Sequence, residues 1–249
     1  MKLGIVSDIH CNIQGLDRAL ELMNGVDQVL CLGDSIYEYR FSNEVIARLI
    51  EIGAPTIQGN HEETFLGPMG VRARAREGID PDLMQWLAER PHRLELDCDG
   101  KKVLMVHSTP WEPRGAYIYR HSPELERFGE ADADFVLFGH THQQVIHRAG
   151  DVLVVNPGSA GDARDPDNGR QLSCAVLDTE TEEARIIDYP ASYHNSAAGL
   201  SFADGHAEIK KWLDPRTIKP INNRLMPLNV ASPNNKDMIW LADRTTIRK

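Results

Sequence analysis

Over the first 60 residues, short apolar runs alternate with longer stretches whose apolar residues follow helical spacing. The runs at residues 3–6 and 26–32 are too short for helices and are typical of buried parallel strands. Residues 13–23 predict a helix that Asn12 can cap, and a second helix is expected around residues 45–50. This alternation predicts an α/β fold with helices on both faces of a sheet.

The rest of the chain adds shorter strands and two hairpins. A short third strand is expected at residues 56–58, and a helix is expected to begin near Pro81. Asp99-Gly100 and Gly150-Asp151 each separate two apolar runs, which predicts two β-hairpins. Further strands are expected at residues 135–138, 172–178 and 184–189.

Polar side chains follow the predicted strands at the points where these strands end. Ligands of open α/β sheets bind at the carboxyl ends of the strands, so these side chains are expected at one edge. A single histidine is more often structural, but four of the strand ends each carry one, which indicates a shared site. The candidate residues are Asp8, His10, Asp34, Asn60, His61, His107, His140 and His142.

This set of residues predicts a site for divalent metal ions. The donors are oxygen or imidazole nitrogen and include no thiol, which suits Mn, Fe, Zn, Ni or Co and is too rich in nitrogen for a calcium site. Seven ligands exceed what one ion needs once water is counted. Two ions that share the Asp34 carboxylate as a bridge fit the set.

Composition and charge narrow the range of partners. The net charge of −10 is uneven, because residues 1–190 hold 18 Lys+Arg against 32 Asp+Glu and residues 191–249 hold 9 against 5. The acidic larger part argues against binding of duplex nucleic acid. No apolar run approaches the roughly 20 residues of a membrane span and no export signal is visible, so a cytoplasmic protein is expected. Four scattered cysteines argue against a disulfide framework.

The motifs together resemble the calcineurin-like metallophosphoesterases, and in particular the bacterial branch of predicted phosphodiesterases. Their signature of Asp-x-His, Gly-Asp, Gly-Asn-His-Glu, a lone His and Gly-His-x-His is found in order at residues 8–10, 33–34, 59–62, 107 and 139–142. The resemblance covers residues 1–190. It implies one metallophosphoesterase domain, a sandwich of two mixed β-sheets flanked by α-helices.

The resemblance also implies a role for each candidate residue. One metal is expected on Asp8, His10, Asp34 and His142, and the other on Asp34, Asn60, His107 and His140. A hydroxide held between the ions is expected to attack a phosphodiester while His61, which is left free, protonates the leaving group as general acid. The substrate is expected to be a small or nucleotide-like phosphoester, and the sequence indicates no substrate-binding residue.

Other functions stay open at this point. The same site suits a phosphomonoesterase or protein phosphatase, and the fold also suits a scaffold that binds metal without turnover. Retention of His61 argues against the scaffold, because a scaffold has no use for a proton donor. A pilin-associated surface protein is disfavoured by the missing export signal.

Several residues near the motifs allow two interpretations. Glu62 either orients His61 or caps the segment that follows. The arginines between residues 72 and 76 either form a solvated face or contact phosphate. The aromatic and basic residues at 117–120 either meet a leaving group or, for the tyrosines, pack in the core. Cys11 has no expected role, although nearby cations favour a thiolate that binds metal or is oxidised.

The C-terminal region, residues 191–249, forms a second part of the chain. It carries proline, asparagine and basic residues with few apolar ones, and it lacks the amphipathic helix that normally closes this family branch. The spacing of His194 and Asp204-Gly205 resembles the tail of bacterial prepilin-like proteins. A small hairpin is expected at residues 202–206, with the last stretch poorly packed.

Overall fold

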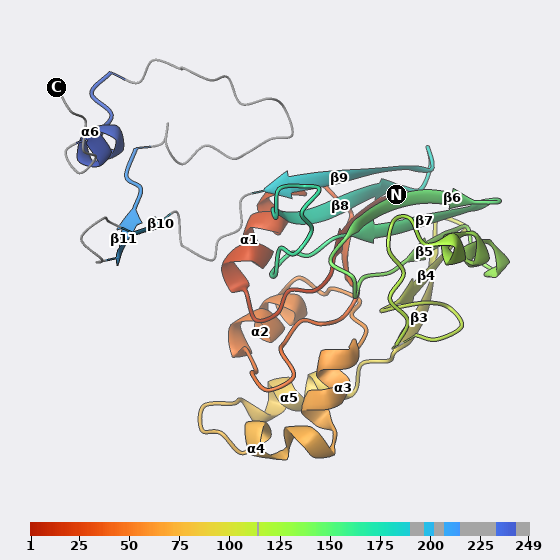
Figure 1. Cartoon of the computed structure of the whole chain (residues 1–249). Helices are drawn as coiled ribbons and strands as arrows, with labels where there is room; N and C mark the ends of the chain where they lie inside the picture. Colours follow the sequence, from red (N-terminus) through yellow and green to blue (C-terminus); the bar gives the residue numbers. More distant parts are fainter. Residues whose placement is uncertain (114, 190–196, 202–206, 215–232, 243–249) are drawn as a thin grey trace. The chain divides into compact units, whose positions relative to one another are not determined.

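The structure is a computed structural model that describes residues 1–113, 115–189, 197–201, 207–214 and 233–242 (Figure 1). The chain divides into two compact units, Met1–Asp188 and Tyr189–Lys249. The first unit contains both large sheets and all of the predicted site residues.

One of the two sheets has four strands in the order β2-β1-β8-β9. Strand β1 is its centre, since it pairs parallel with β2 and antiparallel with β8. The bounds are β1 (Lys2–Val6), β2 (Gln28–Cys31), β8 (Leu172–Asp178) and β9 (Glu183–Tyr189).

The other sheet has five strands in the order β3-β4-β5-β7-β6, with the two predicted hairpins at its edges. Strand β5 is parallel to β4 and to β7, whereas the hairpin pairs β3/β4 and β6/β7 are antiparallel. The bounds are β3 (Arg93–Cys98), β4 (Lys101–Val106), β5 (Phe135–Leu137), β6 (Gln144–Ala149) and β7 (Val152–Pro157). The predicted fold, a sandwich of two mixed sheets, is therefore confirmed.

Both faces of the five-stranded sheet are buried, which explains why its inner strands are apolar runs without alternation. Met105, Leu137 and Val155 point toward Ile5 and Leu30 of the other sheet in the central core. Alternate residues of the same strands pack against Phe128 and other residues on the outer face. The metal-binding candidates follow directly on these buried strands, so the core holds their backbone in place.

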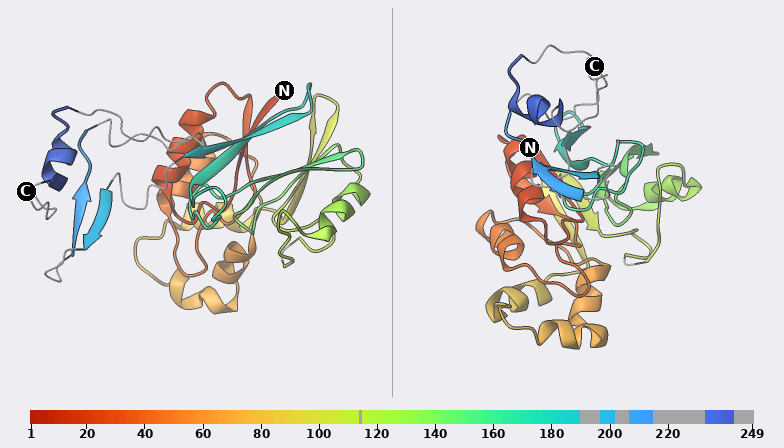
Figure 2. Two further views of the ribbon diagram at one scale, coloured as in Figure 1. Left: turned by 45° about the horizontal axis from the view of Figure 1, so that its top comes forward. Right: turned by 60° about the vertical axis from the view of Figure 1, so that its left-hand side comes forward.

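Helices cover the outer faces of the sandwich (Figure 1). Asn12 and Ser42 accept hydrogen bonds from N–H groups of the first turn and cap the first two helices. In the left view of Figure 2, α1 and α2 lie on one side of the strands and η2, in green, lies on the other. The bounds are α1 (Ile13–Leu22), α2 (Asn43–Glu51), α3 (Asn60–Leu66), η1 (Pro68–Gly70), α4 (Val71–Arg74), α5 (Pro81–Ala88) and η2 (Pro123–Glu130).

Two features differ from the expectations. The third strand is reduced to one parallel bridge between Cys31 and Thr56, because residues 55–57 run beside β2 for too short a distance. Helix α3 begins at Asn60, where the sequence shows no helical spacing.

The arginines between residues 72 and 76 allowed two interpretations, and two of them contact the backbone. Arg74 and Arg76 donate to backbone carbonyls, including Gly67 O and Tyr39 O, so their role is to close these loops.

The second unit contains a two-stranded antiparallel pair and one short helix, β10 (Ala197–Ser201), β11 (Ala207–Lys211) and α6 (Lys236–Ala242). The expected hairpin turn at residues 202–206 lies outside the described residues, as does His194. The sequence did not predict α6. The Asp237 carboxylate accepts hydrogen bonds from the N–H groups of Leu213 and Asp214, which ties α6 to the residues after β11. Among the described residues, no helix is long and apolar enough to span a membrane.

A chain that lacks residues 192–249 is expected to fold and to bind as much metal as the full chain. The reason is that three apolar clusters of the sandwich and its helices, among the described residues, use nothing beyond Ile186. Thermal unfolding and elemental analysis of both proteins measure this. Aggregation of the short chain, or loss of its metal, would show that the second unit completes the core.

Candidate metal centre

The eight candidate residues come together at the edge of the sandwich where β1, β2, β4 and β5 end. Asp8 and Asp34 lie just beyond β1 and β2, and His107 and His140 lie just beyond β4 and β5. Most of the carboxylates and imidazoles here are almost fully buried, including Asp8 at 0% and Asp34 at 1% exposure. The structure therefore brings the predicted site residues together in one buried cluster.

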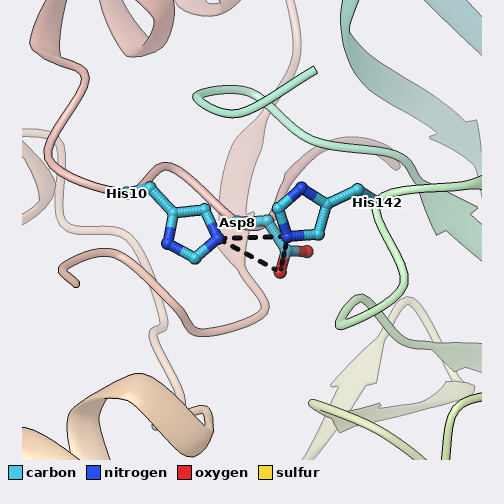
Figure 3. A group of neighbouring side chains, drawn as sticks. All are labelled: Asp8, His10 and His142. Atoms are coloured by element: carbon cyan, nitrogen blue, oxygen red, sulfur yellow. Dashed lines mark hydrogen bonds and ion pairs between the residues drawn. The ribbon is translucent and has the colours of Figure 1, made fainter. Parts of the chain in front are cut away.

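Asp8, His10 and His142 form the first group of donor atoms, shown in Figure 3. The Nε2 atoms of the two imidazoles face each other at 3.1 Å, and His142 Nε2 lies 3.4 Å from Asp8 Oδ1. Two neutral imidazoles that direct lone pairs at each other repel unless a proton or a cation lies between them. Bonds of about 2.0–2.1 Å to one ion place neighbouring donors about 3 Å apart, which is the spacing seen here.

Asp34, His107 and His140 form the second group, and their donor atoms lie within 4.8 Å of one another. His107 Nε2 lies 3.2 Å from Asp34 Oδ2 and 3.2 Å from the side-chain oxygen of Asn60. Asp34 also shares a group with His10 and His61, again within 4.8 Å. Asp34 is thus the carboxylate that lies next to both halves of the site.

Backbone carbonyls set the direction of two of the imidazoles. His107 Nδ1 donates to Leu32 O at 2.8 Å, and His142 Nδ1 donates to Asp162 O at 2.6 Å, which leaves Nε2 of each ring facing the other donors. Metal-binding histidines commonly donate their second ring N–H in this way, because the contact fixes both tautomer and orientation.

Burial and the Asp34 carboxylate set the pKa values of the histidines in the site. Burial opposes the protonated form of His107, but the adjacent Asp34 carboxylate outweighs it and holds the pKa of His107 at about 10. Burial lowers the pKa values of His10 and His140 to about 4, so both rings are neutral donors at pH 7. His107 therefore carries the positive charge that a divalent ion would supply.

The remaining polar atoms test whether metal ions fit. Asp8 Oδ1 and His140 Nε2 are buried and have no hydrogen-bond partner among the described residues. A buried carboxylate oxygen or imidazole nitrogen without a partner is costly, whereas coordination to a cation would satisfy both atoms. The carboxylate, amide and imidazole donors are those that divalent transition metals accept, so the residues fit the ions.

His61 lies beside the donor groups but has its own partners. Its Nδ1 is 2.7 Å from the Glu38 carboxylate and 3.1 Å from the Glu38 N–H, and its Nε2 is 3.8 Å from Asp34 Oδ2. The carboxylate contact requires a protonated Nδ1 and the N–H contact a bare one. Both contacts turn Nε2 toward the centre of the site.

Glu62 has a structural role, which decides between its two interpretations. Its carboxylate is fully buried and accepts N–H hydrogen bonds from Asp34 at 2.9 Å, Ser35 at 2.7 Å and Gly59 at 2.8 Å. It therefore caps α3 and ties the segment after β2 to the segment before α3. Burial and the nearby Asp34 raise the pKa of Glu62.

Cys11 is likewise structural in this arrangement. Its Sγ donates to Arg40 O at 3.1 Å, and burial raises the pKa of the thiol. These surroundings do not favour the thiolate that was considered as the alternative to no role for Cys11.

Glu38 and Tyr37 were not singled out from the sequence, and the exposure of Tyr117 and Tyr119 excludes one of the two interpretations given for them. Tyr37 stacks on the His10 ring with centroids 4.6 Å apart. Tyr117 lies over the His140 ring at 4.0 Å and is 57% exposed, so the packing in the core considered for it is wrong. These contacts come from loops without hydrophobic periodicity, so no signal in the chain showed where the side chains point.

A two-sheet sandwich with carboxylates and imidazoles gathered at one edge is the arrangement of a metal-dependent hydrolase. A model of the calcineurin-like phosphoesterase superfamily domain matches residues 1–182. The chain belongs to this superfamily and is a metal-dependent phosphoesterase, as the motifs predicted. Membership implies divalent metal ions and a phosphoester substrate.

Three relatives illustrate the similarity. Phosphodiesterase MJ0936 of Methanocaldococcus jannaschii is 27% identical over 200 residues, covering 75% of this chain and 98% of that protein. Phosphodiesterase YfcE of Escherichia coli is 25% identical over 190 residues, 72% of this chain and 89% of that protein. The crystal structure of a metallophosphoesterase from Sphaerobacter thermophilus has the same fold, with a TM-score of 0.62, 24% identity, and coverage of 76% of this chain and 88% of its own.

The family match ends at residue 182, and neither the prepilin-like resemblance of residues 191–249 nor a cytoplasmic location is supported by these relatives. Both stay predictions.

Gly59 lies in close contact with two of the proposed metal ligands, Asp34 and His107. Its φ of −102° suits any residue, so the backbone conformation does not require glycine here. A Cβ at this position would instead overlap the Asp34 carboxylate and lie 2.8 Å from His107 Cε1. Gly59→Ala is therefore expected to destabilise the fold by about 1–3 kcal/mol and to lower the metal content.

The control is Gly25→Ala, where φ is +88° but a Cβ meets nothing within 4 Å. It is expected to cost about 1 kcal/mol while metal content stays at the wild-type level. Thermal unfolding and elemental analysis report both quantities. Full metal content in Gly59→Ala would contradict the packing explanation.

Proposed function

We propose that this protein is a binuclear metal-dependent phosphodiesterase. The observation that carries the proposal is that Asp34 shares one group of donor atoms with His10 and another with His107 and His140. In each half of the site one buried atom, Asp8 Oδ1 or His140 Nε2, has no hydrogen-bond partner among the described residues. One ion is assigned to Asp8, His10, Asp34 and His142. The other is assigned to Asp34, Asn60, His107 and His140.

Hydrolysis of a phosphodiester requires a nucleophile, neutralisation of charge and a proton for the leaving group. When bound, the two ions supply an activated water as nucleophile and neutralise the charge of the phosphoryl oxygens. His107 and His142 are held in position by their Nδ1 hydrogen bonds, so the donors need little reorganisation. The leaving alkoxide still requires a proton.

His61 is proposed to give that proton from Nε2. With both ring nitrogens protonated, the imidazolium forms an ion pair with the Glu38 carboxylate, 2.7 Å from Nδ1, and Nε2 faces Asp34 in the site. After the transfer the remaining ring proton is on Nδ1, next to the Glu38 carboxylate, so the neutral ring keeps this orientation. Glu38 thus orients the acid, a role that the sequence assigned to Glu62 as one of two options.

The names of the two curated phosphodiesterases above favour a diester over a monoester, and the monoester reading of the same site is the alternative. The experiment compares bis-nitrophenyl phosphate with nitrophenyl phosphate after chelation and separate addition of Mn, Fe, Zn, Ni or Co. We expect no turnover without metal and a higher kcat/KM for the diester with the best metal. A monoester preference would replace phosphodiesterase by phosphatase.

Substitution of His61 separates the acid from the metal donors. His61→Ala is expected to keep both metals and to lower kcat by roughly 10²- to 10⁴-fold for a diester with an alkyl leaving group. The loss should be small for nitrophenolate, which departs without a proton. Steady-state kinetics with both substrates and elemental analysis measure these effects.

The matched control is His147→Ala, since His147 also pairs with a glutamate, Glu126, at 3.0 Å but lies on β6 away from the site. It is expected to leave both rates unchanged. Equal loss for the two leaving groups in His61→Ala, or loss of metal, would identify His61 as a ligand or a structural residue.

A further inference from the structure

Two exposed tyrosines lie at the edge of the metal centre, next to His140. The Tyr117 ring is tilted by 32° over the His140 ring with centroids 4.0 Å apart. The Tyr119 ring lies 6.3 Å from Tyr117 at an interplanar angle of 20°. The two side chains are 57% and 46% exposed, which is a large apolar area to leave in water beside a polar site.

The segment that carries these rings is held by Ile118, between them, and by Arg120, directly after them. Ile118, between the two tyrosines, is 5% exposed and packs in the outer core of the five-stranded sheet. Arg120 pairs with the buried carboxylate of Asp165 and, at 3.2 Å, with the exposed carboxylate of Asp167. The alternation of exposed and buried side chains therefore presents the rings outward from a fixed backbone, and Arg120 is occupied by protein carboxylates.

The position of the rings distinguishes the two ester groups of a diester. His61, the proposed acid, contacts Asp34 and lies 4.7 Å from His10, ring to ring. Tyr117 lies against His140, in the other donor group. If the leaving oxygen faces His61, the ester group that stays on phosphorus faces the tyrosines.

We propose that Tyr117 and Tyr119 bind a planar aromatic group, of the nucleobase class, on the retained ester of the substrate. Stacking on tyrosine accepts any base, because every base has a π-face, and does not require a hydrogen-bond donor. The substrate class that follows is a nucleoside phosphodiester. This inference rests on the proposed function, which it deepens.

The test compares two diesters that share the nitrophenolate leaving group and differ in the retained group, thymidine or methyl. The ratio of kcat/KM, thymidine ester over methyl ester, is expected to exceed one in the wild type. In Tyr117→Ala this ratio should fall by about 5- to 100-fold, which corresponds to about 1–3 kcal/mol. Tyr117→Phe should keep it, since stacking needs only the ring.

Tyr39→Ala is the matched control, because Tyr39 is also exposed, at 44%, and no ring contact between it and a donor residue is found among the described residues. It should keep the wild-type ratio. A ratio unchanged in Tyr117→Ala, or lowered equally in Tyr39→Ala, would overturn the proposal.

Calorimetric binding of thymidine monophosphate and methyl phosphate to the same proteins separates the two hypotheses. Tighter binding of the thymidine compound in the wild type, lost in Tyr117→Ala and kept in Tyr117→Phe, is expected even if neither diester is turned over. Absence of turnover would then count against the phosphodiesterase, whereas equal binding of the two compounds by the wild type would overturn the stacking proposal alone.

Discussion

The metal centre depends on a backbone constraint at the strand ends. Five of the seven proposed ligands have positive φ, in a region that costs a residue other than glycine about 1–2 kcal/mol. A residue in the left-handed conformation ends the extended backbone of the strand. The chain therefore turns at this residue, and its side chain stays at the sheet edge. The residues are Asp8 at φ 53°, His10 at 49°, Asp34 at 50°, His140 at 67° and His142 at 56°.

Hydrogen bonds from other segments hold this strained backbone. Asp8 O accepts from Gly161 N at 3.1 Å and from the Ser159 hydroxyl at 2.7 Å, and His10 N donates to Asp34 O at 3.0 Å. Glu62 adds the contacts to the backbone of Asp34 described above. Strain of this kind persists where the surroundings over-determine it, and it is typical of functional sites. The backbone of these donor residues is thus held by contacts within the protein.

The central strands and the first helices were predictable because burial on both faces leaves plain apolar runs, and because Asn12 provides a local cap. Both hairpins followed from two-residue turns in which Gly100 and Gly150 take positive φ. The short parallel bridge at Thr56 and helix α3 were not predictable, because neighbouring segments rather than local periodicity stabilise them.

The sequence by itself determined the class of the protein, since ligand-type residues recur at the ends of apolar runs and the order of strands brings such ends to one edge. It also named the eight residues that meet there. Only the tertiary structure decided which partner each residue has: that Glu38 and not Glu62 contacts His61, and that Tyr117 covers His140. The physical reason is that these contacts join loops far apart in the chain, whose side-chain directions depend on strained backbone and on packing that no local pattern encodes.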